Sequence, residues 1–446
     1  MITNLLFKKI DNSPLIIFRI FFGILISLEC FGAIITGWVK KTLIEPSFTF
    51  SFIGFEWLQP LPGVGMYAYF ILMGMLGILI AVGYKYRLSI ISFTILWTAV
   101  YLMQKTSYNN HYYLLILISF LMCFLPAHRY YSLDCRLHKE LQQNSMFGYV
   151  KWIIVAQLFL VYTYASIAKM YGDWLDFTVI EILMRSKASY PLIGDLLQLP
   201  WTHYIIGIMG IVFDLLIIPA LLWKPTRKWA FAFAIFFHLF NSIVFQVGIF
   251  PYLALAFTVF FFNPKTIQKI FFKNKSFYQD QDISEKKPHN TKWLLLGCSI
   301  YFFVQFALPL RHYLIEDRVL WTEEGHRMSW RMMLRSRSGT IQFNVVDKAN
   351  GKSTKVFLNQ YLTLKQQEKI AAYPDFIWQF TQHLKKEYAA KGITIGVYAK
   401  GKVSINGRPP QPFIDPVVDL ANEKWDAFKH HSWILPSNFS ELILYK

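Results

Sequence analysis

Residues 14–38 read PLIIFRIFFGILISLECFGAIITGW, an apolar stretch interrupted by one arginine and one glutamate. A helix needs about 20 apolar residues to cross the hydrocarbon core of a bilayer, so this stretch is long enough to span it. Eight further apolar stretches follow: 63–83, 88–103, 112–127, 152–168, 204–223, 229–247, 250–262 and 293–310. Of these, the stretch 250–262 is short and continues directly from 229–247. The pattern predicts a mainly α fold, a polytopic membrane helix bundle of about nine spans.

The composition agrees with a membrane protein. Of the 446 residues, 54% are hydrophobic and only 16% are charged, whereas an average soluble domain carries about 25% charged residues. This excludes a disordered chain and disfavours a wholly soluble one. The four cysteines form no CxxC pair, so zinc and redox-dithiol sites are not expected, and no metal site is predicted.

The loop charges predict an orientation. If the N-terminus is cytoplasmic, the loops on that side, together with the basic linker 265–292, hold most of the lysines and arginines between the apolar stretches. The positive-inside rule then places the segment after the last span on the exoplasmic side. We attribute the net charge of +18 to this topology and not to nucleic-acid binding, because the basic residues are spread over short loops.

The sequence divides into a membrane domain, residues 1–310, and a soluble exoplasmic α+β domain, residues 311–446. The second part has ordinary soluble composition. Its alternating apolar residues and turn residues predict a hairpin, a broken helix and a pair of short strands: 339–358, 362–389 with a break at Tyr373-Pro374, and 393–405 followed by a turn at Asn406-Gly407.

Polar side chains within the apolar stretches are candidates for function, because an ionisable group inside a bilayer is costly unless it is paired or faces water. The candidates are Glu29, His111, Lys169, Asp214 and the pair His238 and Asn241, which lie one helical turn apart. Each also has a structural interpretation. Lysine can snorkel to the interface, histidine can cap a helix, the carboxylates can join helices or pair with Arg19, and His238 with Asn241 can be a packing pair.

Six short motifs resemble the vitamin K-dependent gamma-glutamyl carboxylase family, whose membrane part is the HTTM domain. They occur in order along nearly the whole chain: KTSYNNH at 105–111, YASIAKMYGDW at 164–174, FHLFNS at 237–242, SWRMMLRSR at 329–337, SIN at 404–406 and IDPVVD at 414–419. The tail has no cysteine, which suits a compact, bacterial-type homologue in an inner membrane, with its tail on the periplasmic face.

The resemblance implies a reaction. A reduced vitamin K hydroquinone, either phylloquinone or menaquinone, reacts with O2 and becomes the epoxide. The strong base formed on the way takes a proton from the γ-carbon of a peptide glutamate, which then captures CO2. The implied partners are a lipid quinone, a glutamate-containing peptide or protein and membrane lipids, with no nucleic acid and no metal.

The resemblance also assigns roles to residues of this chain. Lys169 matches the catalytic base, and burial at the membrane edge favours the neutral amine that a base needs. His111 matches a histidine near the quinone, where it can steady the developing negative charge on oxygen. Supporting positions near the quinone are Asn109, Asn110, Arg185, His238 and Asn241.

The tail motif at 329–337 matches the region that the family uses near its glutamate substrate. The candidates there are Trp330, Met332, Met333, Arg335 and Arg337. The two arginines are suited to clamp a carboxylate with paired hydrogen bonds. Arg331 and Arg335 both depart from the family pattern, which puts identical handling of the substrate in doubt.

Two other functions stay open. One is a hydroquinone epoxidase that does not carboxylate protein; it keeps Lys169 and His111 but needs neither Arg335 nor Arg337. The other is a non-enzymatic membrane transporter or assembly protein, in which Glu29, Asp214 and His238 form a path for protons or substrate.

Overall fold

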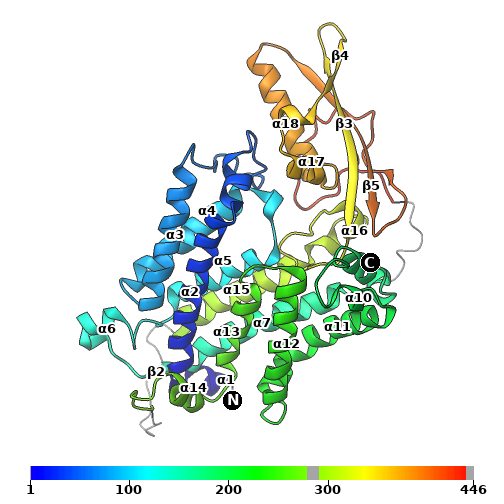
Figure 1. Cartoon of the computed structure of the whole chain (residues 1–446). Helices are drawn as coiled ribbons and strands as arrows, with labels where there is room; N and C mark the ends of the chain where they lie inside the picture. Colours follow the sequence, from blue (N-terminus) through cyan, green and yellow to red (C-terminus); the bar gives the residue numbers. More distant parts are fainter. Residues whose placement is uncertain (1, 279–290, 438–446) are drawn as a thin grey trace.

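The computed structural model describes residues 2–278 and 291–437. It consists of a bundle of helices and a smaller part with a sheet, which stands on the end of the bundle away from the N-terminus (Figure 1). The expected fold class is therefore confirmed: a polytopic helix bundle followed by a small α+β part.

Within the described residues, seven helices are long and apolar enough to cross a membrane: α2 Ser13–Ile35, α3 Gly65–Val82, α4 Tyr86–Met103, α7 Gly148–Ala168, α11 Pro200–Leu222, α12 Arg227–Phe245 and α15 Thr291–Leu310. Two more apolar helices are shorter, α5 Asn110–Phe124 and α13 Phe250–Phe257, which continues as the 3-10 turn Thr258–Phe260. Each of the nine predicted stretches is thus helical, but two of them are not full-length spans. The chain reverses between α12 and α13 through Gln246 and Gly248, both with positive φ.

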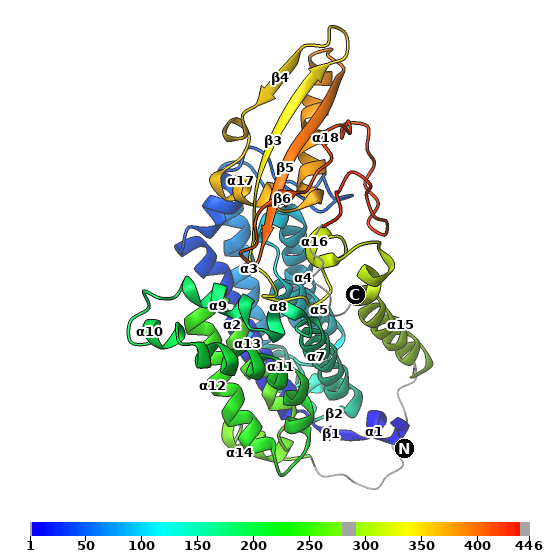
Figure 2. The same ribbon diagram turned by 90° about the vertical axis from the view of Figure 1, so that its right-hand side faces the viewer.

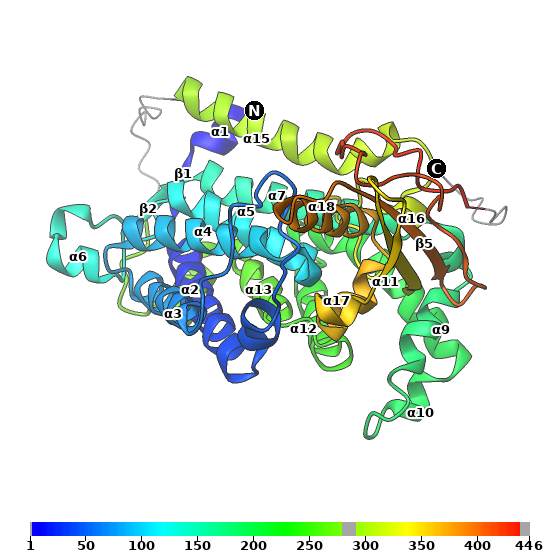
Figure 3. The ribbon, with the colours of Figure 1, turned by 90° about the horizontal axis from the view of Figure 1, so that it is seen from above.

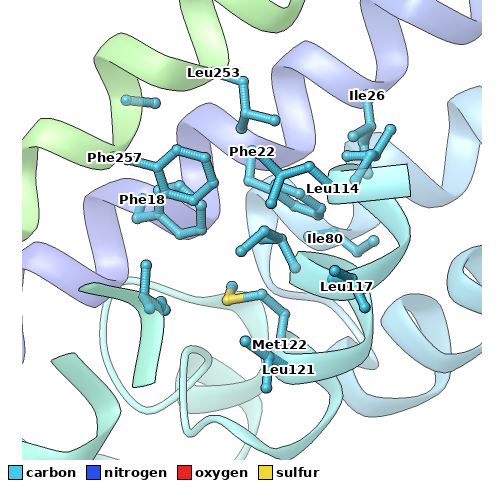
Figure 4. Close-up of a cluster of buried hydrophobic side chains, with 14 of the residues drawn as sticks. Phe18, Phe22, Ile26, Ile80, Leu114, Leu117, Leu121, Met122, Leu253 and Phe257 are labelled. Atoms are coloured by element: carbon cyan, nitrogen blue, oxygen red, sulfur yellow. The ribbon is translucent and has the colours of Figure 1, made fainter. Parts of the chain in front are cut away.

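The core of the bundle forms around α2. Phe18, Phe22 and Ile26 face side chains from α3, α5 and α13 (Figure 4). The rings of Phe18 and Phe257 stack with centroids 4.9 Å apart. Helices α2 and α3 approach closely at Gly23, where a Cβ would lie 2.4 Å from the backbone nitrogen of Ala81. Small residues at a helix contact are the usual means of close packing in a membrane, where burial of apolar surface drives little association.

The sheet of the tail has the order β4-β3-β5-β6 and is antiparallel throughout. Its strands are β3 Arg337–Asp347, β4 Ser353–Val356, β5 Ile395–Ile405 and β6 Gln411–Pro412. Helices α17 Leu364–Ile370 and α18 Pro374–Ala390 join it in one hydrophobic core. The predicted hairpin, the helix break at Tyr373-Pro374 and the turn after residue 405 are confirmed.

The predicted pair of short strands at 393–405 is wrong. Residues Ile395–Ile405 form one strand of 11 residues, which pairs with β3 along its whole length from Arg337↔Ile405 to Asp347↔Ile395. Gly401 lies within this strand and does not form a turn. A Cβ there would lie 3.3 Å from Ile414, so glycine at this position leaves space for the segment packed against the strand.

The tail docks on the loops at one end of the bundle (Figure 2). Phe50, in the loop before α3, stacks on Phe376 of α18 at 4.7 Å between centroids. Lys105 donates to Asp375 at 2.6 Å, and Arg327 donates to the same carboxylate at 2.7 Å. Helix α15, which leads into the tail, lies at the edge of the bundle beside α7 (Figure 3).

Candidate functional site

Lys169 follows the last residue of α7 and caps the helix through its backbone N–H. The side chain is 10% exposed, so it does not snorkel out to the interface. The ammonium nitrogen donates to Oδ2 of Asp214 and lies 5.4 Å from the ring centroid of Trp174. Gly210 of α11 leaves room for these groups, because a Cβ there would lie 3.1 Å from Trp174 and 3.9 Å from Lys169.

Asp214 is buried near the middle of α11. Its partner is Lys169 and not Arg19, which was one of the alternatives drawn from the sequence. Arg19 instead donates to the backbone carbonyls of Ala127 and Tyr131. The pairing of Lys169 with Asp214 joins α7 to α11 by a buried ion pair.

His111 is the second residue of α5. Its ring stacks on Phe250 of α13, with centroids 4.0 Å apart and planes inclined by 18°. His238 of α12 lies nearby, 6.2 Å from the same phenylalanine ring, and is buried. Nε2 of His238 is 3.3 Å from the hydroxyl of Tyr162. Its Nδ1 has no hydrogen-bond partner among the described residues.

These groups surround one cavity of about 690 Å³, which we name the Lys169 cavity. Lys169, Asp214, His111, His238 and Asn241 all line it. The rest of its wall is almost entirely apolar and comes largely from α11 and α12, with Met332 and Met333 of the tail segment closing one side. The sequence-predicted base, histidines and asparagine are thus brought together around a space suited to a lipid-soluble molecule.

Three of the predicted quinone-site residues do not line this cavity. Asn109 caps α5 by accepting from the N–H of Tyr112, so the capping role suggested for His111 belongs to Asn109. Asn110 donates to the carbonyl of Arg331 at 3.2 Å, so it links α5 to the tail segment. Arg185 is exposed and pairs with Glu181 on its own helix, α9 Thr178–Arg185.

The tail segment after α16 Val319–Thr322 passes over the Lys169 cavity. Trp330 is buried, and its ring stacks on Tyr113 of α5 at 5.0 Å. Met332 and Met333 line the cavity. Hydrogen bonds from the bundle hold this segment at both ends, since Asn110 donates to the carbonyl of Arg331 and Tyr171 donates to that of Leu334.

Arg335 and Arg337 do not present a free clamp, contrary to the expectation from the sequence. Arg335 donates through two nitrogens to the two carboxylate oxygens of Glu323, which is 3% exposed. Although burial opposes its charge, the neighbouring Glu323 carboxylate raises the pKa of Arg335 above its usual value. Arg337 donates to the carbonyls of Leu320 and Trp321. The carboxylate of Glu323 therefore already pairs with Arg335, and it also lies 3.7 Å from Arg337.

Asp173, four residues after Lys169, pairs with the tail: Arg408 donates to it at 2.5 and 2.7 Å, and Asn406 donates to it at 2.6 Å. Burial raises the pKa of this carboxyl, but the bonds from Arg408 and Asn406 outweigh burial and leave the pKa below its usual value. Asp173 therefore fastens the tail to α8 Gly172–Leu175.

Sequence reasoning missed Phe250, Trp174 and Tyr162 as parts of the site. Trp174 ends the motif at 164–174, but nothing in the sequence distinguishes Phe250 and Tyr162 from the many other aromatic residues of the chain. The pairing of Lys169 with Asp214 did have a signal. Each is a charged group in or beside a long apolar stretch, and two opposite charges buried in a membrane protein are expected to meet.

Glu29 is not part of the Lys169 cavity. It accepts from the hydroxyl of Tyr112 at 2.5 Å, so it joins α2 to α5 beside His111. Among the described residues, no group of three or more histidine, cysteine, aspartate or glutamate side chains is placed to hold a metal ion.

Comparison with known proteins gives two family matches. The HTTM domain model matches residues 7–265, and the lumenal domain model of the vitamin K-dependent gamma-carboxylase matches residues 290–440. The first covers more than half of the chain, and the second begins before α15 and so includes this helix as well as the tail. No solved structure matches the chain.

Proposed function

Since the chain belongs to the vitamin K-dependent gamma-carboxylase family, we propose that it is an integral membrane enzyme that couples oxygenation of a quinone hydroquinone to carboxylation of glutamate. The observation that carries this proposal is the Lys169 cavity, in which a buried amine and two buried or half-buried histidines face a mostly apolar space. A lipid quinone needs such a wall for its hydrocarbon tail and polar groups only at its ring.

Lys169 is the proposed general base for the phenolic proton of the hydroquinone. The free amine takes the proton, and the ammonium that results has Asp214 as its counter-ion, in the geometry of the present pair. Opposite charges interact strongly where water is excluded, so Asp214 stabilises the product of this step. The aromatic face of Trp174 lies beside the same nitrogen and supports the cation further.

His111 is the proposed hydrogen-bond partner of the quinone oxygen. Its ring is held by stacking on Phe250, so its orientation is fixed before the substrate enters. A donor that is already in place where negative charge develops contributes more than one that must reorganise. His238, whose Nδ1 lacks a partner among the described residues, is available for a second polar contact in the same cavity.

The overall reaction balances as hydroquinone, O2, CO2 and glutamate giving quinone epoxide, water and γ-carboxyglutamate. Oxygenation of the hydroquinone supplies a base strong enough to remove the γ-proton of glutamate. The residues of the chain bind and orient the substrates, take the first proton and exclude water from the cavity, which prevents the strong base from being quenched.

The proposed orientation has the N-terminus in the cytoplasm and the tail on the exoplasmic side, which rests on the distribution of basic residues between the loops. Reporter fusions test it. A reporter that is active only in an exoplasmic compartment should be active after residue 437 and inactive after residue 225, in the loop before α12. The reverse result would overturn the orientation.

The function is tested by formation of vitamin K epoxide from the hydroquinone and O2, with protein purified in detergent. We expect epoxide from the wild type and from the matched control Lys41→Ala, an exposed lysine outside the Lys169 cavity. We expect none above background from Lys169→Ala that elutes as a folded protein. Epoxide formation by Lys169→Ala at the rate of the control would overturn the proposal. The absence of epoxide from folded wild type, with both phylloquinone and menaquinone hydroquinones, would also overturn it.

A further inference from the structure

Arg331 lies in the segment that passes over the Lys169 cavity, and it is not itself one of the residues that line the cavity. The next two residues, Met332 and Met333, line the cavity. The backbone carbonyl of Arg331 accepts from Asn110, the neighbour of His111 in the sequence. At the other end of the segment, the carbonyl of Leu334 accepts from Tyr171, which lies two residues after Lys169. The position of Arg331 is therefore tied to both sides of the proposed site.

The other arginines of this segment have anionic or carbonyl partners. Arg327 pairs with Asp375 at 2.7 Å, Arg335 pairs with Glu323, and Arg337 donates to Trp321 at 2.6 Å. For the guanidinium of Arg331, residues 2–278 and 291–437 provide neither an ion pair nor a hydrogen bond.

The surroundings of Arg331 make an unpaired cation costly there. The side chain is only partly exposed, and burial lowers its pKa to about 10, with the nearby charge of Arg335 acting in the same direction. It nevertheless remains a cation at neutral pH. A partly buried charge without a counter-ion is unfavourable, and an incoming anion would remove that cost.

We propose that Arg331 binds the γ-carboxylate of the glutamyl substrate at the edge of the Lys169 cavity. This inference rests on the proposed function. A guanidinium can hold both oxygens of a carboxylate with parallel hydrogen bonds, which fixes the plane of the group as well as its position. The role that the sequence suggested for Arg335 and Arg337 thus passes to the one arginine of this segment whose guanidinium has no partner among the described residues.

Binding at this place also serves the chemistry. When the Cγ–H bond breaks, the proton goes to the base formed by hydroquinone oxygenation, and the electron pair spreads from Cγ onto the carboxylate oxygens. The negative charge on these oxygens grows in that step, so their contact with Arg331 strengthens in the transition state. The same electron pair then forms the new bond from Cγ to CO2.

Peptide kinetics test the proposal in the full chain. The assay contains vitamin K hydroquinone, O2, labelled bicarbonate and a short glutamyl peptide, and it follows label incorporation and epoxide separately. We expect Arg331→Gln to raise the KM for the peptide by about tenfold or more, while epoxide formation without peptide stays within about twofold of wild type. Arg331→Lys should fall between the two, because lysine keeps the charge but not the paired geometry.

The matched control is Arg136→Gln, an exposed arginine on α6 Leu133–Leu137, for which we expect the wild-type KM. An Arg331→Gln enzyme that makes epoxide and has the wild-type KM and kcat for the peptide would overturn the inference. Normal epoxide formation in that variant leaves the quinone part of the proposed function standing, so the two failures can be told apart.

Equilibrium binding gives a readout that does not depend on turnover. A fluorescent glutamyl peptide and its glutamine counterpart are titrated against wild type and Arg331→Gln in detergent. We expect wild type to bind the glutamyl peptide about tenfold more tightly than the glutaminyl one, and the variant to lose this preference. An equal preference in both proteins, or none in wild type, would overturn the assignment of Arg331.

Discussion

Lys169 and Asp214 form an ion pair inside the bundle, although 45 residues separate them in the chain. The lysine comes from the end of α7 and the aspartate from the interior of α11, so the pair exists only when these helices pack against each other. Both side chains also line the cavity that holds His111 and His238. Asp214 therefore holds the side chain of the proposed base in position before any substrate enters.

Replacement of Asp214 tests that relationship. The change Asp214→Asn keeps the size of the side chain but removes the negative charge, so the ammonium form of Lys169 loses its counter-ion. Because a cation without a counter-ion is costly where water is excluded, we expect the rate of epoxide formation to fall by about tenfold or more.

The measurement is the initial rate of epoxide formation, with the wild type and Asp214→Asn compared at one pH in one detergent. Thermal unfolding of both proteins serves as the control for folding. An equal rate in both folded proteins would show that Asp214 does not stabilise the ammonium formed in this step.

The stacked pair of His111 and Phe250 supports a second prediction. Loss of one hydrogen-bond donor to a developing oxyanion typically costs about 100-fold to 1000-fold in kcat, and we expect a loss of that size for His111→Ala. Loss of one aromatic contact is worth about 1 kcal/mol, so Phe250→Leu should lower kcat by tenfold or less. Equal losses for the two variants would mean that His111 acts only through packing.

The sequence predicted much of the site because membrane burial makes polar residues rare and therefore informative. Lys169, His111, His238 and Asn241 were all identified as exceptions in or beside apolar stretches, and all four line the Lys169 cavity. Their meeting could not be derived from spacing, because they come from three helices whose relative packing depends on many apolar contacts. The resemblance to a family supplied that link.

The sequence predicted less about the tail, where charged residues are common and each has many possible partners. Arg335 and Arg337 were expected to meet a substrate carboxylate, but Glu323, 12 residues before Arg335, takes that place. Only the folded segment reveals which cations are already neutralised. The long strand Ile395–Ile405 was also missed, because its glycine was consistent with a break until its pairing with β3 was seen.

The contact of Asp173 with Arg408 supports a prediction about pH and stability. The pKa of Asp173 is below its usual value of 3.8 in the folded chain: burial opposes the charge, but the bonds from Arg408 and Asn406 outweigh it. A group of this kind contributes its full stability above the unfolded pKa and loses it as the pH falls through the lower, folded value. The contact should therefore be intact at pH 5 to 7 and weaken below about pH 4.

Thermal unfolding in detergent measures this effect. We expect wild type to exceed Asp173→Asn by a constant margin in unfolding temperature between pH 5 and 7, and the margin to shrink as the pH falls toward 3. The exposed pair Lys40 and Glu45 offers a control, since Glu45→Gln should have little effect at any pH. A margin for Asp173→Asn that stays constant down to pH 3 would contradict the assigned role.

The bond between Arg335 and Glu323 distinguishes a structural arginine from one that binds substrate. Arg335→Gln leaves the buried Glu323 carboxylate without its closest partner, and breaking such a pair from one side costs about 3–5 kcal/mol in the free energy of unfolding. The double variant Glu323→Gln with Arg335→Gln should lose less than the sum of the two single changes, because the pair is removed together. Denaturation in detergent gives these values. If Arg335→Gln were instead as stable as wild type and raised only the KM for a glutamyl peptide, Arg335 would be the substrate clamp and the assignment to Arg331 would fail.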